Sequence, residues 1–224
     1  MGPATRISGG MNAPGPILHS GKPGAVGGKA GPSHWSALCH VMGYLKKHPS
    51  FQLHYRRCGT RDPLSGYVDS DWSSPRSVTG YVTLFNQTPL SWQTKRQPTT
   101  ALSTAEAECM AGSVIAKELI YLRHLFTNPG FPPRAPTPVG EGNSACIEWT
   151  NRIIGGRERA EHLDLRIVRK RFAHQAAQDG GIRLYKAASA DRLADLLTKS
   201  LSEPHLLRCV DGLLQLDASL LKRS

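Results

Sequence analysis

The sequence predicts an α/β domain built on a mixed five-stranded sheet flanked by helices. Three β-like segments follow one another closely between residues 66 and 97. Two more, at 137–141 and 182–188, each come after a helical segment. Short connections make the first three strands antiparallel neighbours, whereas a strand that follows a helix joins a sheet naturally in parallel. The expected order is β-β-β-α-β-α-α-β-α.

The N-terminal part divides into two segments. Residues 1–33 are dominated by Gly, Pro, Ser and Ala, and we expect a disordered leader. Residues 34–60 form a connecting segment. It begins with an amphipathic helix over 34–47, because apolar residues recur there at spacings of three and four. A short strand is expected at 51–56. The main domain is expected over 61–201, followed by a C-terminal helix and tail over 202–224.

Alternating and β-branched residues predict the first three strands at 66–72, 77–86 and 90–97. The run Asn86-Gln-Thr-Pro89 predicts a turn between the last two strands. Ser103-Thr-Ala-Glu106 fits a capping box, so a helix should begin there and continue to about residue 126.

After the fourth strand, at 137–141, the pattern predicts a short helix over 143–151 and a stronger one over 161–178. The fifth strand at 182–188 leads into a helix over 190–199. A last helix should cover 203–216.

The composition favours a polyanionic partner. The 224-residue chain has 28 Lys and Arg against 17 Asp and Glu, a formal charge of +11, and nucleic acid is the commonest polyanion. A generic basic surface is the alternative. The five cysteines form no C-x-x-C pair, so we expect reduced thiols and no disulfide. The chain has no apolar run of membrane-spanning length, and its N-terminus lacks the apolar core of a signal peptide. We therefore expect an intracellular protein in the cytoplasm or nucleus.

Three carboxylates from separate elements are candidates for a metal site. Asp69 lies on the first strand, Glu108 in the first turns of the capped helix, and Asp195 in the helix after the fifth strand. Active groups in α/β sheets gather at strand ends and helix starts. Oxygen ligands suit Mg²⁺ or Mn²⁺, and two such ions can promote phosphodiester cleavage. The alternative for each residue is an ordinary surface charge or, for Glu108, complementation of the helix dipole.

Several motifs resemble the ribonuclease H region of copia-type retrotransposon Pol polyproteins. They are GYVDSDWSSPRSVTGYV, SWQTKRQPTTALSTAEAECMA, ERAEHLDLR and ADRLADLLTKSL, in that order along the chain. The resemblance implies a ribonuclease H fold and hydrolysis of the RNA strand of RNA–DNA hybrids by two Mg²⁺ or Mn²⁺ ions. It assigns Asp69 rather than Asp71, Glu108 rather than Glu106, and Asp195 as catalytic metal ligands.

The helix over 34–47 resembles the stretch between polymerase and ribonuclease H in the same family. The resemblance therefore names the upstream polymerase domain as the ancestral partner.

The family's third carboxylate falls on Gly142. The matching run is Glu141-Gly142-Asn143, where the family has Glu-Asp-Asn or Cys-Asp-Asn. We expect Glu141 to face the opposite side of its strand and Glu148 to lie too far along the helix, so neither should replace the missing ligand. Cleavage should therefore be severely weakened or absent. The alternatives are a non-catalytic nucleic-acid-binding module and a retroelement remnant without a role.

Basic residues should bind the hybrid through its phosphates, shape and 2′-hydroxyls. Solvated surface charges are the alternative. We expect Trp72 and Trp92 to pack in the core or on a sheet face, and not to stack on bases. The candidate nucleic-acid-binding residues are Lys95, Arg96, Arg157, Arg159, Arg166, Arg169, Lys170 and Lys199.

Overall fold

The computed structural model describes residues 31–47, 53–55, 62–73, 75–151, 176–177 and 179–214. Most of the expected leader, nearly all of the helix expected over 161–178, and the end of the chain lie outside these residues. So do five of the candidate basic residues, namely Arg157, Arg159, Arg166, Arg169 and Lys170.

The sheet has five strands in the order β3-β2-β1-β4-β5. Strands β1, β2 and β3 are antiparallel neighbours, and β4 and β5 are added in parallel beside β1. This mixed α/β sheet is the predicted one, and it is the arrangement that the resemblance to ribonuclease H implies. The strands are β1 (Leu64–Asp71), β2 (Val78–Phe85), β3 (Thr88–Arg96), β4 (Thr137–Glu141) and β5 (Ile182–Lys186).

The turn between β2 and β3 is a two-residue hairpin loop. Asn86 and Gln87 have φ values of 50° and 67°, and positive φ at both central residues is typical of a type I′ turn. Because this turn is tight, β3 begins at Thr88, two residues earlier than predicted.

Helix α3 (Thr104–Thr127) begins as the capping box predicts. The Ser103 side chain accepts a hydrogen bond from the backbone N–H of Glu106 at 3.1 Å. The Glu106 carboxylate reaches back to the N–H of Leu102, at 2.6 Å, one residue before the expected partner. Glu106 is therefore used at the helix start, and Glu108 remains the acidic residue of this turn that is available to a site.

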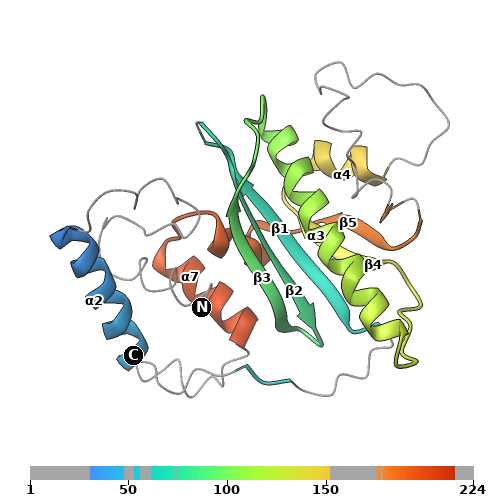
Figure 1. The fold of residues 1–224 in the computed structure, drawn as a ribbon, viewed down its shortest axis with the longest axis horizontal. Coiled ribbons are helices and arrows are strands. Elements are labelled where there is room, and N and C mark those ends of the chain that lie inside the picture. The colour runs from blue at the N-terminus through green and yellow to red at the C-terminus, as the bar shows by residue number, and fades with distance from the viewer. Residues whose placement is uncertain are drawn as a thin grey trace.

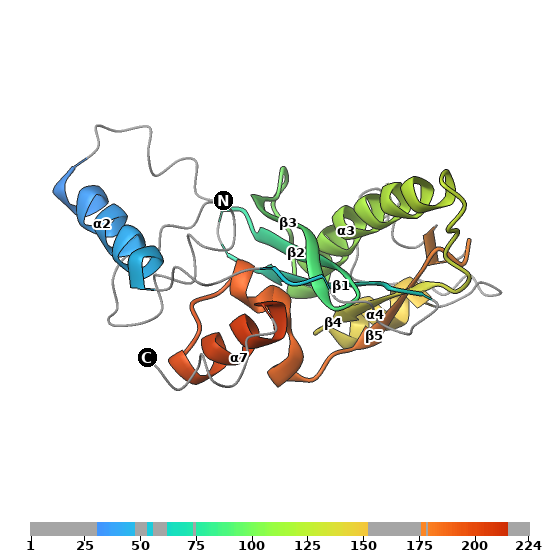
Figure 2. The same ribbon diagram turned by 90° about the horizontal axis from the view of Figure 1, so that it is seen from below.

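The sheet is covered on both faces, as Figures 1 and 2 show. One face packs against α3 and α4 (Ser144–Asn151), with Ile115, Leu119 and Val139 in this core. The other packs against the 3-10 helix η3 (Leu193–Leu197) and helix α7 (Glu203–Leu214), with Val82, Leu196 and Val210 in a second core.

The helix predicted over 190–199 is wrong in type. Two short 3-10 helices stand there instead, η2 (Ser189–Asp191) and η3. Arg192 lies between them with φ −76° and ψ 80°, a non-helical conformation that interrupts the hydrogen-bond ladder.

The helix predicted over 34–47 is confirmed as α2 (Pro32–Lys47). The strand predicted over 51–56 is not formed at the described residues 53–55. There the chain contacts the sheet by single hydrogen bonds, from Thr88 to the carbonyl of His54 and from Tyr55 to the carbonyl of Pro89.

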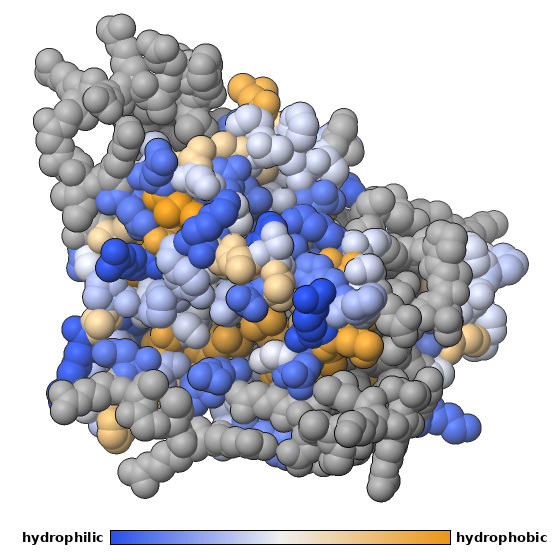
Figure 3. Space-filling model, turned by 180° about the vertical axis from the view of Figure 1, so that it is seen from behind, coloured by the Kyte–Doolittle hydropathy of each residue, from blue (hydrophilic) through white to orange (hydrophobic). Residues whose placement is uncertain are grey.

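The described surface is mainly polar. From behind the view of Figure 1, most side chains are hydrophilic, and apolar ones gather in a band across the middle (Figure 3). Among the described helices, none combines the length and the apolar character that crossing a membrane requires.

Candidate active site

Asp69 lies near the carboxyl end of β1, on the sheet face that packs against η3. It pairs in register with Gly80 of β2. A side chain at Gly80 would collide with the η3 segment, because a β-carbon there would lie 2.6 Å from Thr198 Cγ2. The close approach lets the Thr198 hydroxyl donate a hydrogen bond to Asp69 Oδ2. The glycine therefore brings the segment after η3 onto the buried carboxylate.

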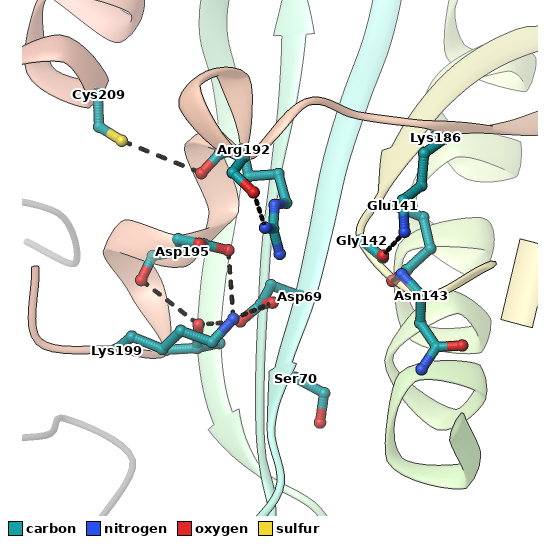
Figure 4. Close-up of polar contacts among 12 residues, drawn as sticks. Asp69, Ser70, Glu141, Gly142, Asn143, Lys186, Arg192, Asp195, Lys199 and Cys209 are labelled. Carbon is teal, nitrogen blue, oxygen red and sulfur yellow. Dashed lines mark hydrogen bonds and ion pairs between the residues drawn. The ribbon is translucent and has the colours of Figure 1, made fainter. Parts of the chain in front are cut away.

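Lys199 joins Asp69 to Asp195. Its ammonium lies 2.6 Å from Asp69 Oδ1 and 3.4 Å from Asp195 Oδ1, and Figure 4 shows the three side chains pointing toward one another. Burial and the nearby Asp69 carboxylate raise the pKa of Asp195. Burial alone would lower the pKa of Lys199, but attraction and hydrogen bonding to Asp69 outweigh it, so the net shift is upward.

Glu108 reaches the same region from the first turns of α3. Its carboxylate accepts a hydrogen bond from the backbone of Ser70, next to Asp69, while its Oε2 is buried without a hydrogen-bond partner among the described residues. Burial, together with the charges of Glu141 and Asp69, raises the pKa of Glu108 to about 10. An acid held this far from water, beside other acids, favours its neutral form unless a cation joins it.

Glu141 does face the side of β4 that alternation predicts, yet it interacts electrostatically with Glu108 and Asp69. It is fully buried at the end of β4. Its side chain does leave the strand on the same face as Val139, but that face packs against α3, the helix that carries Glu108. Its Oε1 accepts the N–H of Asn143 at 2.8 Å, and its Oε2 has no partner among the described residues. Burial above all, with the charge of Asp69, raises its pKa to about 8.

Gly142 follows Glu141 in the turn into α4. Asn143 caps that helix by accepting the N–H of Cys146 at 3.0 Å. The ammonium of Lys186 donates to the carbonyl of Gly142 and to Ser144 Oγ. On the other side, a β-carbon added to Gly142 would lie 2.7 Å from Arg192 Nη1 and 3.5 Å from its Cζ. The guanidinium of Arg192 therefore borders the space that the family's third carboxylate would enter.

Among the three predicted carboxylates, Asp69 is the charge that acts on the other two. Asp69, Glu108 and Asp195 come from β1, α3 and η3. The donor chemistry fits a hard divalent cation, and Glu108 and Glu141 each have an unpartnered buried oxygen. The spatial arrangement of these side chains, however, does not fit a divalent cation. No three Asp, Glu, His or Cys side chains of the described residues are grouped so that they could hold a metal ion.

The described basic residues take different positions. Lys95 is exposed and Arg96 half-buried at the end of β3. Arg96 lies in the same sheet row as Asp71, two strands away. Lys199 is half-buried, with 36% of its side chain exposed, and its ammonium is paired with Asp69 and Asp195.

Trp72, which was predicted to pack in the core or on a sheet face, does not lie in the core. Its side chain is 52 % exposed just after β1, and its indole N–H donates to the carbonyl of Ala101 at 3.1 Å. Trp92 is half-buried against the second core, which agrees with sheet-face packing.

Sequence reasoning missed two residues of this site, Glu141 and Arg192. The signal for Glu141 was its position two residues after Val139, on the face that a crossover helix must cover. Arg192 had no such signal, because its place depends on the break between η2 and η3.

No protein-family model matches the chain. The chain is 30% identical over 174 residues to the retrovirus-related Pol polyprotein from transposon TNT 1-94 of Nicotiana tabacum, and 29% identical over 174 residues to that from transposon RE2 of Arabidopsis thaliana. Each match covers 75% of this chain but 12% of the polyprotein.

A shorter relative has a different description. The secreted RxLR effector protein 161 of Plasmopara viticola is 41% identical over 95 residues, which cover 41% of this chain and 66% of that protein.

Proposed function

This chain is a retrotransposon Pol-derived domain, and we propose that it is a ribonuclease H-like domain that binds RNA–DNA hybrids and hydrolyses their RNA strand weakly or not at all. The observation that carries the proposal is the electrostatic influence of Asp69, near the carboxyl end of β1, on Glu108 of α3 and Asp195 of η3. Ligand sites of parallel strands lie at that end of a sheet.

Hybrid binding is supported by charge. The chain has a formal charge of +11. Lys95 and Arg96 lie at the C-terminal end of β3, which is at the same end of the sheet as Asp69. Phosphates and 2′-hydroxyls are the groups by which proteins recognise A-form-like duplexes. The basic residues outside the described part belong to the same proposal.

Weak hydrolysis follows from what the cluster lacks. In the family that this chain resembles, Mg²⁺ or Mn²⁺ would activate water and stabilise the leaving oxygen. Asp69, Glu108 and Asp195 are the residues that would hold it, but they are not grouped closely enough to do so. Gly142 supplies no side-chain oxygen, and one oxygen of each aspartate is already paired with Lys199. Misplacing reacting groups by about 1 Å costs roughly 100-fold, so we expect at least that loss of rate.

Cleavage of a labelled RNA–DNA hybrid in Mg²⁺ and in Mn²⁺ tests the proposal. The wild-type chain should cut at least about 100-fold more slowly than Gly142→Asp combined with Arg192→Gln. The double change is needed because the new side chain would meet the Arg192 guanidinium. Arg192→Gln alone should not restore cutting, and adding Asp69→Asn to the double variant should abolish it.

Two results would contradict the proposal. Efficient wild-type cleavage that Asp69→Asn removes would show that Gly142 does not cripple the site. A wild-type chain that neither cuts nor binds the hybrid at low salt would leave the fold without the proposed function.

A further inference from the structure

We propose that Arg192 forms an anion subsite in the place of the missing carboxylate, where it binds a backbone phosphate of the nucleic acid without a divalent cation. The inference rests on the hybrid binding proposed above and names the group that makes one of its contacts. Because Gly142 has no side chain, the Arg192 guanidinium can stand beside it and make this part of the acidic site suitable for a negative ligand.

The first support is the position of the guanidinium. Arg192 Nη1 lies where a β-carbon of residue 142 would be only 2.7 Å away. A longer side chain at 142 would therefore have to displace it, and glycine leaves it in place. Figure 4 shows the Arg192 side chain extending between Asp69 and Gly142.

The second support is the unused hydrogen-bonding capacity of Arg192. A guanidinium has five N–H donors. One nitrogen of Arg192, Nη2, donates to Ser189 Oγ, whereas Nε is buried and has no hydrogen-bond partner in the described part of the chain. Buried donors without a partner are uncommon, and each one calls for a ligand or another explanation.

The third support is the way the surrounding charges are already paired. Asp69 and Asp195 share the ammonium of Lys199. Arg192 also acts electrostatically on Asp195, but Lys199 is the cation in contact with that carboxylate. Lys186 adds a second positive charge at Gly142 by donating to its carbonyl. The Arg192 guanidinium is therefore not needed as the counter-ion of Asp69 or Asp195, because Lys199 already has that role.

The ligand that suits this corner is a phosphodiester. Guanidinium N–H groups match phosphate oxygens in a fork geometry, and such charge-assisted bonds are stronger than neutral ones. A phosphate here would supply the acceptor that Nε lacks in the described part of the chain. A divalent cation would be repelled by the same group.

Hybrid binding in EDTA tests the subsite. The full-length wild type and Arg192→Gln would be titrated with a fluorescein-labelled RNA–DNA hybrid at several salt concentrations. Arg192→Gln should weaken binding about tenfold and reduce the salt slope by about one. Arg134→Gln is the matched control, because Arg134 is exposed before the start of β4, away from the cluster. Equal effects of the two changes would overturn the inference while leaving hybrid binding intact.

Variants at Gly142 separate charge from shape. Gly142→Asp should weaken EDTA binding at least as much as Arg192→Gln, because the new carboxylate would pair with the guanidinium. Gly142→Asn, of the same shape but neutral, should weaken it less. If both variants bind like the wild type, Arg192 is not the phosphate contact.

Inorganic phosphate provides a readout that does not depend on hybrid binding. The side-chain Nε–H resonance of Arg192, assigned by its loss in Arg192→Gln, should shift saturably with phosphate in the wild type and not in Gly142→Asp. A shift without hybrid binding would retain the subsite and reject the proposed function. No shift would reject the subsite.

Discussion

Asp69 is the most constrained charge of the site, because each of its oxygens has a different partner. One oxygen accepts the Thr198 hydroxyl and the other contacts the Lys199 ammonium. Both partners belong to the segment after η3. This segment can lie close to the sheet because Gly80 has no side chain in its way. Removing one member of a buried pair costs far more than the pair itself contributes. The position of Asp69 is thus fixed by its fold contacts before any ligand is present.

Glu141 should make stability depend on pH. Burial raises the pKa of Glu141 in the folded chain to about 8, from an ordinary value of 4.5 that applies to the unfolded chain. The folded state therefore holds this proton more tightly, and the resulting stability is full below about pH 4.5 and lost as pH rises through about 8. We expect the wild type to lose stability over this range, by a few kcal/mol at about 1.4 kcal/mol per pKa unit.

The measurement is the free energy of unfolding in urea with EDTA, at several pH values from 5 to 8.5, for the wild type and Glu141→Gln. The variant keeps the size of the side chain and removes the titrating proton, so its stability should fall less steeply. Parallel pH curves would show that the Glu141 carboxyl is not held neutral.

A substitution in the hairpin loop between β2 and β3 should increase the stability of the fold. Gln87 adopts φ 67°, a conformation that costs an L-residue roughly 1–2 kcal/mol and costs glycine little. Gln87→Gly creates an Asn-Gly turn and should raise the free energy of unfolding by roughly 0.5–1 kcal/mol. Gln93→Gly, inside β3, is the control of opposite sign. Urea unfolding of both variants measures the difference, and destabilisation by Gln87→Gly would contradict the turn type.

Elements with a strong local pattern were predictable from sequence, and those fixed by tertiary contacts were not. The strands were found within a few residues because alternation and β-branching report burial on a sheet. Residues 190–199 contain no helix breaker, yet the chain leaves helical geometry at Arg192. There the carbonyl of Leu197 accepts the Thr94 hydroxyl and the carbonyl of Arg192 lies near Cys209.

The same division applies to the site. Asp69 and Glu108 could be chosen because each follows a recognisable strand or helix signal, whereas Asp195 was chosen although its helix was predicted in the wrong type. The role of Glu141 required knowing that α3 covers its face of β4, so local alternation gave the correct face and the wrong conclusion. Arg192 required the tertiary structure itself.

At the scale of the molecule, the formal charge of +11 should make hybrid binding strongly dependent on salt. Each neutralised phosphate releases counter-ions, and about four contacts would weaken binding roughly 100-fold between 50 and 200 mM salt. Fluorescence anisotropy with a hybrid, and with a DNA duplex of equal length, would measure this slope. A slope near zero would show that the basic charge does not face nucleic acid, and equal affinity for both duplexes would show that the 2′-hydroxyls are not recognised.

The ammonium of Lys199, which lies between Asp69 and Asp195, has a consequence for whether the fold needs a bound metal ion. Because the enclosed negative charge is neutralised by the polypeptide itself, folding draws on no external ion supply. Glycine at position 142 is compatible with the same architecture, because the contacts of Lys199 with Asp69 and Asp195 do not involve that residue. The fold can therefore persist whether or not the proposed chemistry does.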